Sequence, residues 1–129
     1  MALGLGLSVT NLADKWNNAL RGTAFSVTAL TVQLHTAIPN ATGTNAASVG
    51  DNTKKTVLLT ASSGGVLAIS GTAGPWTNGG TAETLSHISV WDGANFLWSA
   101  ALTSTQAWNS ANTFTLTSIG LSLTPLATT

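Results

Sequence analysis

The chain has 129 residues, no cysteine, four basic and four acidic residues, and a net charge of zero. Charged residues make up only 6% of the chain and hydrophobic ones 43%, which excludes intrinsic disorder, and no basic cluster exceeds two residues, which argues against nucleic-acid binding. The length predicts one domain over residues 1–129, and the low charge favours a folded, β-rich protein that covers part of its surface with partner subunits.

The first ten residues, "MALGLGLSVT", form a mildly apolar arm. They lack the positive charge of a signal peptide and the uninterrupted apolar run of a membrane span, so we expect no export signal and no membrane partner. Residues 11–21 then carry apolar side chains at helical spacing, which predicts the single helix of the chain. Asn11 or Thr10 is the expected N-cap, and Gly22 the expected stop.

A strand pattern with a period of two replaces the helical pattern after Gly22. Residues 30–38 alternate between apolar and polar, which predicts a half-buried strand that ends before Pro39. Residues 39–53 have the composition of a loop, and residues 71–81, "GTAGPWTNGGT", predict a second, glycine-rich loop with Trp76 at its tip. The remaining strands are predicted at residues 55–61, 66–70, 85–92, 96–102, 113–117 and 121–126.

The predicted fold class is therefore mainly β. Six to seven short strands over residues 30–126, with turn signals between them, are typical of an antiparallel β-sandwich or a small barrel, with the N-terminal α-helix outside it. The stretch "LSHISVWDGANFLWSAAL" predicts a hairpin that turns at Asp92 and Gly93. Trp91 and Trp98 in this hairpin, and Trp16 on the helix, are expected to be core residues.

The sequence contains little that could perform catalysis. His35 and His87 are its only histidines, and no acid lies at a recognised metal-ligand spacing from them, so we predict neither a metal site nor a cofactor. His87, Asp92 and a serine could be drawn as a triad, but the sequence has no nucleophile elbow. Glu83 and Asp92 lie nine residues apart, on opposite faces and at opposite ends of one predicted strand. We therefore predict no enzyme and no catalytic residues.

Two tryptophans lie in or beside polar loops, Trp76 in "GPWTN" and Trp108 in "QAWNS". Exposed loop tryptophans are typical of protein interfaces, and they also stack on sugars, although local packing is a third interpretation. Together with the apolar arm and the loop over residues 39–53, they suggest a partner interface. Its predicted residues are Leu3, Leu5, Leu7, Pro39, Asn40, Trp76 and Trp108.

Four segments resemble a family of small virion proteins of tailed bacteriophages. "LTVQLHTAIPNATGTNAASVG" is similar to the family's "ALHTADPG-x-TG-x-NE" segment, and "LADKWNNALRGTAF" to its N-terminal helix. "LSHISVWDGANFLWSAALT" resembles its "THVGLWDA…FLGSGALT" hairpin, and "NTFTLTSIGLSLTPLA" its closing strands. The chain departs from the family pattern at Ile38, where relatives often have an acid, and at "GDNTKKTVLL", where an aromatic-x-Arg pair is replaced and Lys54 or Lys55 could supply part of the contact.

The resemblance implies a non-enzymatic virion structural protein that assembles in the host cytoplasm. Family members are labelled tail-fibre or minor tail proteins, and some are capsid decoration proteins. Because the chain has no stalk repeat and no heptads, we favour a decoration protein that binds the major capsid protein or other virion subunits, with a homo-oligomer also possible. A minor tail or tail-fibre protein is the first alternative, and a carbohydrate-binding module is the alternative from another class.

Overall fold

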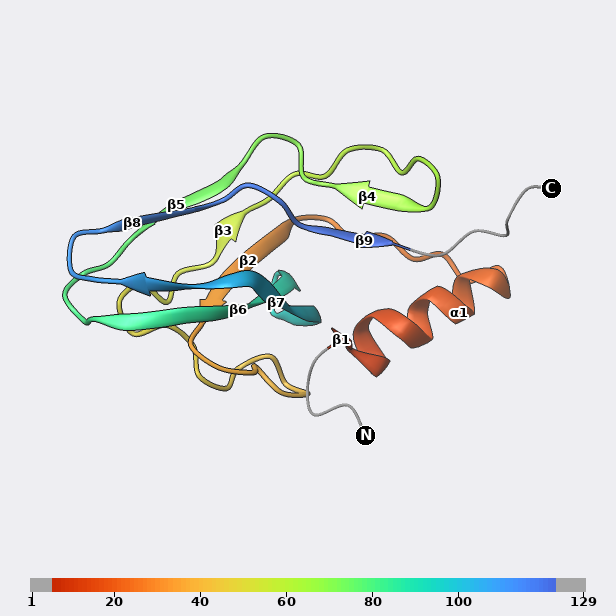
Figure 1. The fold of residues 1–129 in the computed structure, drawn as a ribbon. Helices are drawn as coiled ribbons and strands as arrows, with labels where there is room; N and C mark the ends of the chain where they lie inside the picture. The colour runs from red at the N-terminus through yellow and green to blue at the C-terminus, as the bar shows by residue number, and fades with distance from the viewer. Residues whose placement is uncertain (1–5, 123–129) are drawn as a thin grey trace.

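The computed structural model describes residues 6–122 and shows two layers of antiparallel strands with a helical segment beside them (Figure 1). One layer is a five-stranded sheet with the order β1-β7-β6-β2-β3, and the other consists of the pairs β4-β9 and β5-β8. The predicted mainly β class is confirmed, and the strands do not close into a barrel. The strands are β1 (Gly6–Leu7), β2 (Leu30–His35), β3 (Lys55–Thr56), β4 (Val66–Ala68), β5 (Ala73–Thr77), β6 (Glu83–Asp92), β7 (Asn95–Trp108), β8 (Thr113–Leu116) and β9 (Gly120–Ser122).

Side chains from both layers meet in one hydrophobic core. Val32 and Val90 of the five-stranded sheet are fully buried, as is Trp76 from the opposite layer. Leu116 of β8 belongs to the same cluster. Burying side chains of this size stabilises a fold by about 1.5–3 kcal/mol each, so the contact between the layers contributes a large part of the stability.

The helical segment begins earlier than the sequence predicted. A π-helical turn, η1 (Val9–Ala13), leads into α1 (Asp14–Leu20). The N-cap is Ser8, whose Oγ accepts a hydrogen bond from the backbone N–H of Asn11 at 3.3 Å, so the predicted cap at Thr10 or Asn11 is wrong. The Asn11 side chain instead donates to the Phe96 carbonyl at 3.0 Å, which ties the turn to β7. In the described part of the chain, no helix has the length and apolar character to cross a membrane.

Several strand boundaries differ from the predicted ones. β2 ends at His35 rather than at residue 38, because the backbone N–H of Thr36 already turns to the Ala46 carbonyl, 2.9 Å away. β3 is limited to Lys55–Thr56 and β4 to Val66–Ala68, whereas β7 continues to Trp108. Of the last predicted strand, residues 121 and 122 belong to β9, and residues 123–126 lie outside the described part.

The predicted glycine-rich loop over residues 71–81 contains a strand. β5 pairs with β8, and Trp76 lies opposite Phe114 with ring centroids 6.2 Å apart. Trp76 is fully buried, and its Nε1 donates to the Thr53 carbonyl at 2.9 Å. Pairing with β8 places this side chain in the hydrophobic core. The expectation of a loop was therefore wrong.

The central hairpin is confirmed. β6 and β7 pair from Asp92 opposite Asn95, and Gly93 adopts a φ of 60° in the turn between them. Trp91 and Phe96 face each other across the hairpin with ring centroids 5.4 Å apart. Trp91 and Trp98 are buried, as predicted, and Trp16 is half-buried against the core.

Replacing Gly93 with valine should lower the free energy of unfolding by about 1–2 kcal/mol, because a side chain at positive φ is strained. No atom lies within 4 Å of an added Cβ, so the effect would come from the backbone conformation alone. Thermal unfolding measures it, and Ala94→Val, at the exposed neighbouring position, is the matched control. Equal melting temperatures for the two variants would contradict this interpretation of the turn.

Candidate functional site

The predicted interface residues are scattered, and several are buried. Trp76 and Trp108 are 0% and 2% exposed, so the expectation of exposed loop tryptophans is wrong for both. Pro39 is also buried, whereas Asn40 is exposed. Leu7 lies in β1 and is 40% exposed. Leu3 and Leu5 lie outside the described residues.

Glu83 organises the loop that follows β2. Its carboxylate accepts hydrogen bonds from the Ser48 hydroxyl and from the backbone N–H groups of Val49 and Gly50, at 3.1 and 3.0 Å for the two backbone donors. Hydrogen bonds to a charged acceptor contribute about 1.5–3 kcal/mol each. The carboxylate thus fixes the loop against the start of β6.

Asn78 forms a second polar centre near the same end of β6. Its Nδ2 donates to the carbonyls of Thr81 and Trp108, at 2.6 and 2.9 Å. Its Oδ1 accepts from the backbone N–H groups of Gly80 and Thr81, at 2.9 and 3.0 Å. The side chain is 2% exposed, so it holds the end of β7 and the turn after β5 in one buried arrangement. The predicted glycine-rich loop over residues 71–81 includes this turn, but the sequence did not predict the tertiary contact.

The aspartates Asp51 and Asp92 also bind the backbone of loops. Asp92 accepts hydrogen bonds from the N–H groups of Thr28 and Ala29 and from the Thr28 hydroxyl, at 3.0–3.3 Å. The Ala29 hydrogen bond is the main cause that holds the pKa of Asp92 below its ordinary value. For Asp51, burial acts to raise the pKa, but the hydrogen bonds from Thr53 and Thr77 and the charge of Lys55 together outweigh it and lower the pKa. Both groups therefore act as structural acceptors.

His35 lies in a buried hydrogen-bond chain between β2 and β6. Its Nδ1 is 2.8 Å from the Asn45 carbonyl, which only accepts, so Nδ1 carries the proton. Its Nε2 then accepts from the Ser89 hydroxyl at 2.7 Å, and that hydroxyl accepts from Trp91 Nε1 at 2.7 Å. Every polar group in this chain is satisfied when His35 is neutral. Burial lowers the pKa of His35 below its ordinary value, in agreement with this arrangement.

The geometry does not assemble a catalytic group from these residues. His87 Nδ1 lies 2.7 Å from the hydroxyl of its neighbour Ser86, whereas Asp92 binds Thr28 and Ala29 at the far end of β6. Glu83 and Asp92 lie at the two ends of the same strand, as predicted. Within residues 6–122, no three metal-ligating side chains come together.

Lys54 occupies part of the region where the chain departs from the phage family pattern. Its Nζ lies 3.5 Å from the centroid of the Trp91 ring, a cation–π contact on the outer side of the central hairpin. Burial lowers the pKa of Lys54 from its ordinary value. Of the two lysines suggested as a substitute for the missing arginine, Lys54 is thus the one that contacts an aromatic ring.

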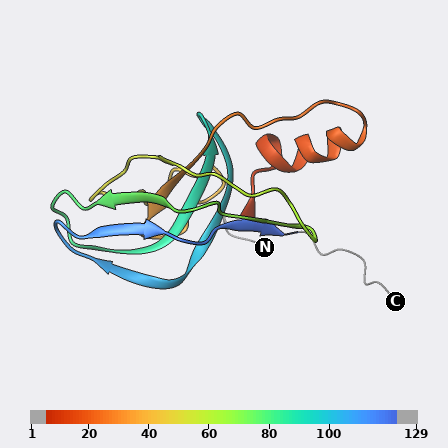
Figure 2. The ribbon, with the colours of Figure 1, turned by 90° about the horizontal axis from the view of Figure 1, so that it is seen from above.

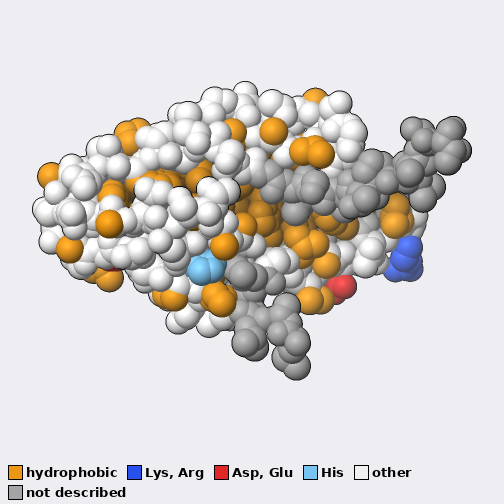
Figure 3. Space-filling view, in the orientation of Figure 1, with side chains coloured by type: hydrophobic (Ala, Val, Ile, Leu, Met, Phe, Trp, Pro, Cys, Tyr) orange, Lys and Arg blue, Asp and Glu red, His pale blue; other side chains and the backbone are white. Residues whose placement is uncertain are grey.

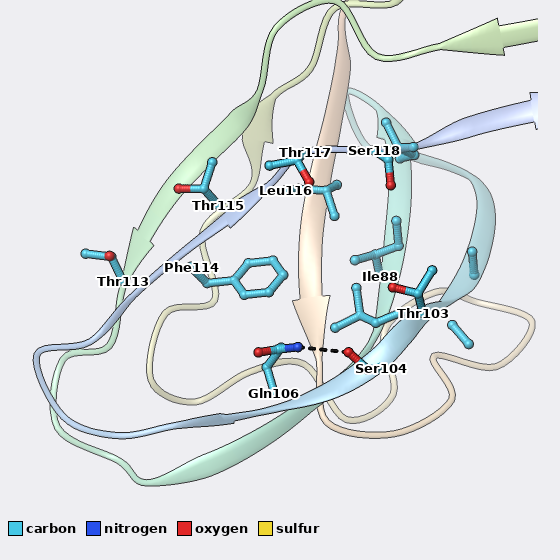
Figure 4. Close-up of a pocket in the computed structure, with 14 residues that line it drawn as sticks. Ile88, Thr103, Ser104, Gln106, Thr113, Phe114, Thr115, Leu116, Thr117 and Ser118 are labelled. Carbon is cyan, nitrogen blue, oxygen red and sulfur yellow. Dashed lines mark hydrogen bonds between the residues drawn. The ribbon is translucent and has the colours of Figure 1, made fainter.

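A cleft of about 500 Å³ opens between β7 and β8. Ile88 of β6 lies in it, with Ala100 and Leu102 on the β7 side and Phe114 and Leu116 on the β8 side. Figure 4 shows Phe114 and Ile88 directed into this space, and in Figure 3 apolar side chains gather in the middle of the same face. The rim is polar and uncharged. We call this site the β7–β8 groove.

The helical segment presents a second open surface. α1 contains no buried residue, and its last residue, Leu20, is 88% exposed. Val9 at the start of η1 is 65% exposed. Figure 2 shows α1 standing to one side of the strands. Leu12 of η1 is buried in the core, Trp16 and Phe25 pack against the core, and most other residues of the helical segment are exposed.

The polar contacts and the open surfaces described above indicate the general class of the protein. Several described polar side chains hold loops, the groove is lined by uncharged residues, and the helical segment exposes Val9 and Leu20, as expected for a structural protein that binds other subunits. A family model described as "Podophage GP4 fiber I protein gp80" matches residues 7–124. The chain belongs to this family of phage fibre proteins, which confirms the resemblance found in the sequence. No curated protein matches the chain.

The His35 chain predicts a pH dependence of stability. Because the pKa of His35 is lower in the folded state, the unfolded state binds more protons below the ordinary pKa of about 6.5. The free energy of unfolding should therefore be highest above that pH and should decrease as the pH falls from about 7 to about 5. Urea unfolding at a series of pH values measures this slope.

His35→Gln should flatten the slope, whereas His87→Gln, at the half-buried position opposite it on β6, should retain the slope. Retention of the full pH dependence in His35→Gln would show that another group is responsible.

Proposed function

We propose that this protein is a subunit of a phage tail fibre that acts by binding other virion subunits, without catalysis. The observation that carries the proposal is the match of residues 7–124 to the fibre family. A protein of this family is a component of the virion, and its partners are other virion proteins. We further propose that it assembles with them in the host cytoplasm.

The use of the titratable side chains supports a non-enzymatic role. Glu83, Asp51 and Asp92 accept hydrogen bonds from neighbouring loops, and His35 is buried in its own hydrogen-bond chain. The carboxylates and the histidine that the sequence offers as candidates for catalysis thus have hydrogen-bond partners within the fold.

The family description favours a position in the tail fibre over a position on the capsid surface. The sequence led us to favour a decoration protein because no stalk repeat is present, and nothing in the comparisons supports that narrower position. The carbohydrate-binding alternative depended on Trp76 and Trp108 stacking on a sugar. Both indoles are buried, so neither is available for stacking.

We propose the exposed side of η1 and α1 as a contact surface for a neighbouring virion subunit. An isolated seven-residue helix has little stability of its own, and burying its exposed apolar side chains would stabilise an assembly. Leu20 is the most exposed large hydrophobic side chain of the described residues, and Leu7 and Val9 lie in the same N-terminal region. Asn40, in the loop that follows β2, remains a further predicted contact residue.

Immunogold labelling of intact virions tests the position in the particle. An antibody against this protein should place gold at the tail fibres and leave the capsid surface unlabelled. Virions disrupted to free their heads from their tails provide the control for hidden epitopes. Gold distributed over the capsid shell would contradict the fibre proposal and favour decoration.

Replacing Leu20 with serine tests the contact surface. Because the side chain is 88% exposed, the free energy of unfolding should change by no more than about 0.5 kcal/mol, while incorporation into particles should decrease. Leu58→Ser, at a position that is 66% exposed and outside the helical segment, is the matched control. Quantitative blotting of purified particles measures incorporation. Equal incorporation of both variants would place the contact elsewhere.

A further inference from the structure

The loop that follows β2 lies on the side of the five-stranded sheet that points away from β5 and β8 (Figure 1). We call residues 36–47 of this loop the flap. Two backbone hydrogen bonds close it, one from the Thr36 N–H to the Ala46 carbonyl and one from the Ser48 N–H to the Leu34 carbonyl, both 2.9 Å long. We call this pair of bonds the neck. The flap thus leaves and rejoins the sheet at one place.

The flap also has hydrogen bonds of its own. The Asn45 N–H donates to the Pro39 carbonyl at 3.0 Å, and the Asn45 side chain donates to the Ile38 carbonyl at 2.9 Å. The Gly43 N–H donates to the Asn40 carbonyl at 3.0 Å. A compact loop whose ends lie close together and that is packed by its own contacts forms a local unit. The flap can therefore open at its neck and keep its internal structure.

The flap covers two groups of the sheet. The Asn45 carbonyl lies 2.8 Å from Nδ1 of His35, which is fully buried. At Gly43 the flap backbone lies against the Phe96 ring, because an added Cβ would be 2.3–2.9 Å from three ring atoms. Phe96 is buried and pairs with Trp91. Opening the flap would expose the His35 ring to water and uncover this aromatic pair.

A second proton on the His35 ring does not fit the closed arrangement. The neutral ring donates from Nδ1 to Asn45 and accepts at Nε2 from the Ser89 hydroxyl. A proton on Nε2 would point at the Ser89 oxygen, which already accepts from Trp91 Nε1. The hydroxyl hydrogen would then lose its acceptor. Within residues 6–122, neither ring nitrogen forms a hydrogen bond to a carboxylate, so the charge would be buried without a counter-ion.

The groups around His35 do not compensate a positive charge. Burial is the largest cause that lowers the pKa of His35, and His87, directly opposite on β6, acts in the same direction. The flap contains no charged residue, and its carbonyls at Asn45 and Ala46 raise the pKa by less than burial lowers it. Lys54, over the indole at the far end of the hydrogen-bond chain, adds another positive charge. The charged ring is therefore more stable when the flap is open.

We propose that protonation of His35 opens the flap at its neck while β2, β6 and β7 remain paired. The flap yields because two backbone hydrogen bonds close it, whereas β6, on the other side of the ring, is paired with β2 at six positions and with β7 along its opposite edge. Opening hydrates the ring and uncovers Phe96. At acid pH the subunit would thus expose an apolar surface that it covers at neutral pH.

Native-state amide exchange of the full chain tests the proposal. The open form binds one more proton than the closed form below the ordinary histidine pKa of about 6.5. After correction for intrinsic rates, exchange of the Thr36 and Ser48 amides should therefore accelerate by about tenfold or more between pH 7 and pH 5. Low concentrations of urea should leave these rates unchanged, because a local opening exposes little surface. Rates that increase with urea as those of the β6 amides do would assign the exchange to global unfolding and overturn the proposal.

Two variants identify the titrating group. His35→Gln cannot be protonated in this pH range and should remove the acceleration, whereas His87→Gln, the matched control on β6, should retain it. Acceleration that persists in His35→Gln, or that disappears in His87→Gln, would contradict the proposal.

The pH at which the acceleration begins gives a measurement that needs no variant. Protonation of His35 predicts a rise that starts near pH 6.5. Glu83 is the alternative group, because its carboxylate binds residues 48–50 beside the neck. An unperturbed glutamate has a pKa of about 4.3. A rise that starts only below about pH 5 would therefore assign the opening to Glu83 and overturn the role of His35.

Discussion

The pairing of β6 with its two neighbours is the interaction on which the rest of the structure depends. β6 pairs with β2 along one edge and with β7 along the other, so its residues Glu83–Asp92 join the two longest ladders of the fold. The tight turn at Gly93 fixes the β7 register, and the opposite layer packs on the inner side chains of this sheet. A shift of one residue would turn the apolar face outward, because side chains alternate along a strand.

Both ends of β6 also carry a carboxylate that binds loop backbone. Asp92 holds the segment that leads into β2, and Glu83 holds the loop that leaves the sheet after β2. Only 6% of the residues are charged, so the chain has few groups that could keep its surface soluble, and these two acids bind loops. Each supplies strong acceptors for backbone donors that loops leave without partners. Three of the four acidic residues, Asp51, Glu83 and Asp92, thus determine where loops lie.

Local patterns predicted the parts of the fold that depend on neighbouring residues. The hairpin at Asp92 and Gly93 followed from its turn signal and flanking alternation, and the helical segment from its periodicity. Trp76 was misassigned because its burial depends on β8, nearly forty residues further along the chain, and on the Thr53 carbonyl. The Asn78 contacts with Trp108 were missed for the same reason. A glycine-rich sequence indicates that a turn can form, but it does not show which distant residues pack against that turn.

The two open surfaces have different consequences for assembly. The β7–β8 groove is lined by strands on both sides, with Ala100 and Leu102 on β7 and Phe114 and Leu116 on β8. The helical segment is more open, and Leu20 projects from it with 88% of its surface exposed. Burying an exposed leucine stabilises an assembly by about 1.5–3 kcal/mol, whereas Ile88 and Leu116 of the groove already belong to the core, so the helical segment gains more from a neighbouring subunit than the groove does.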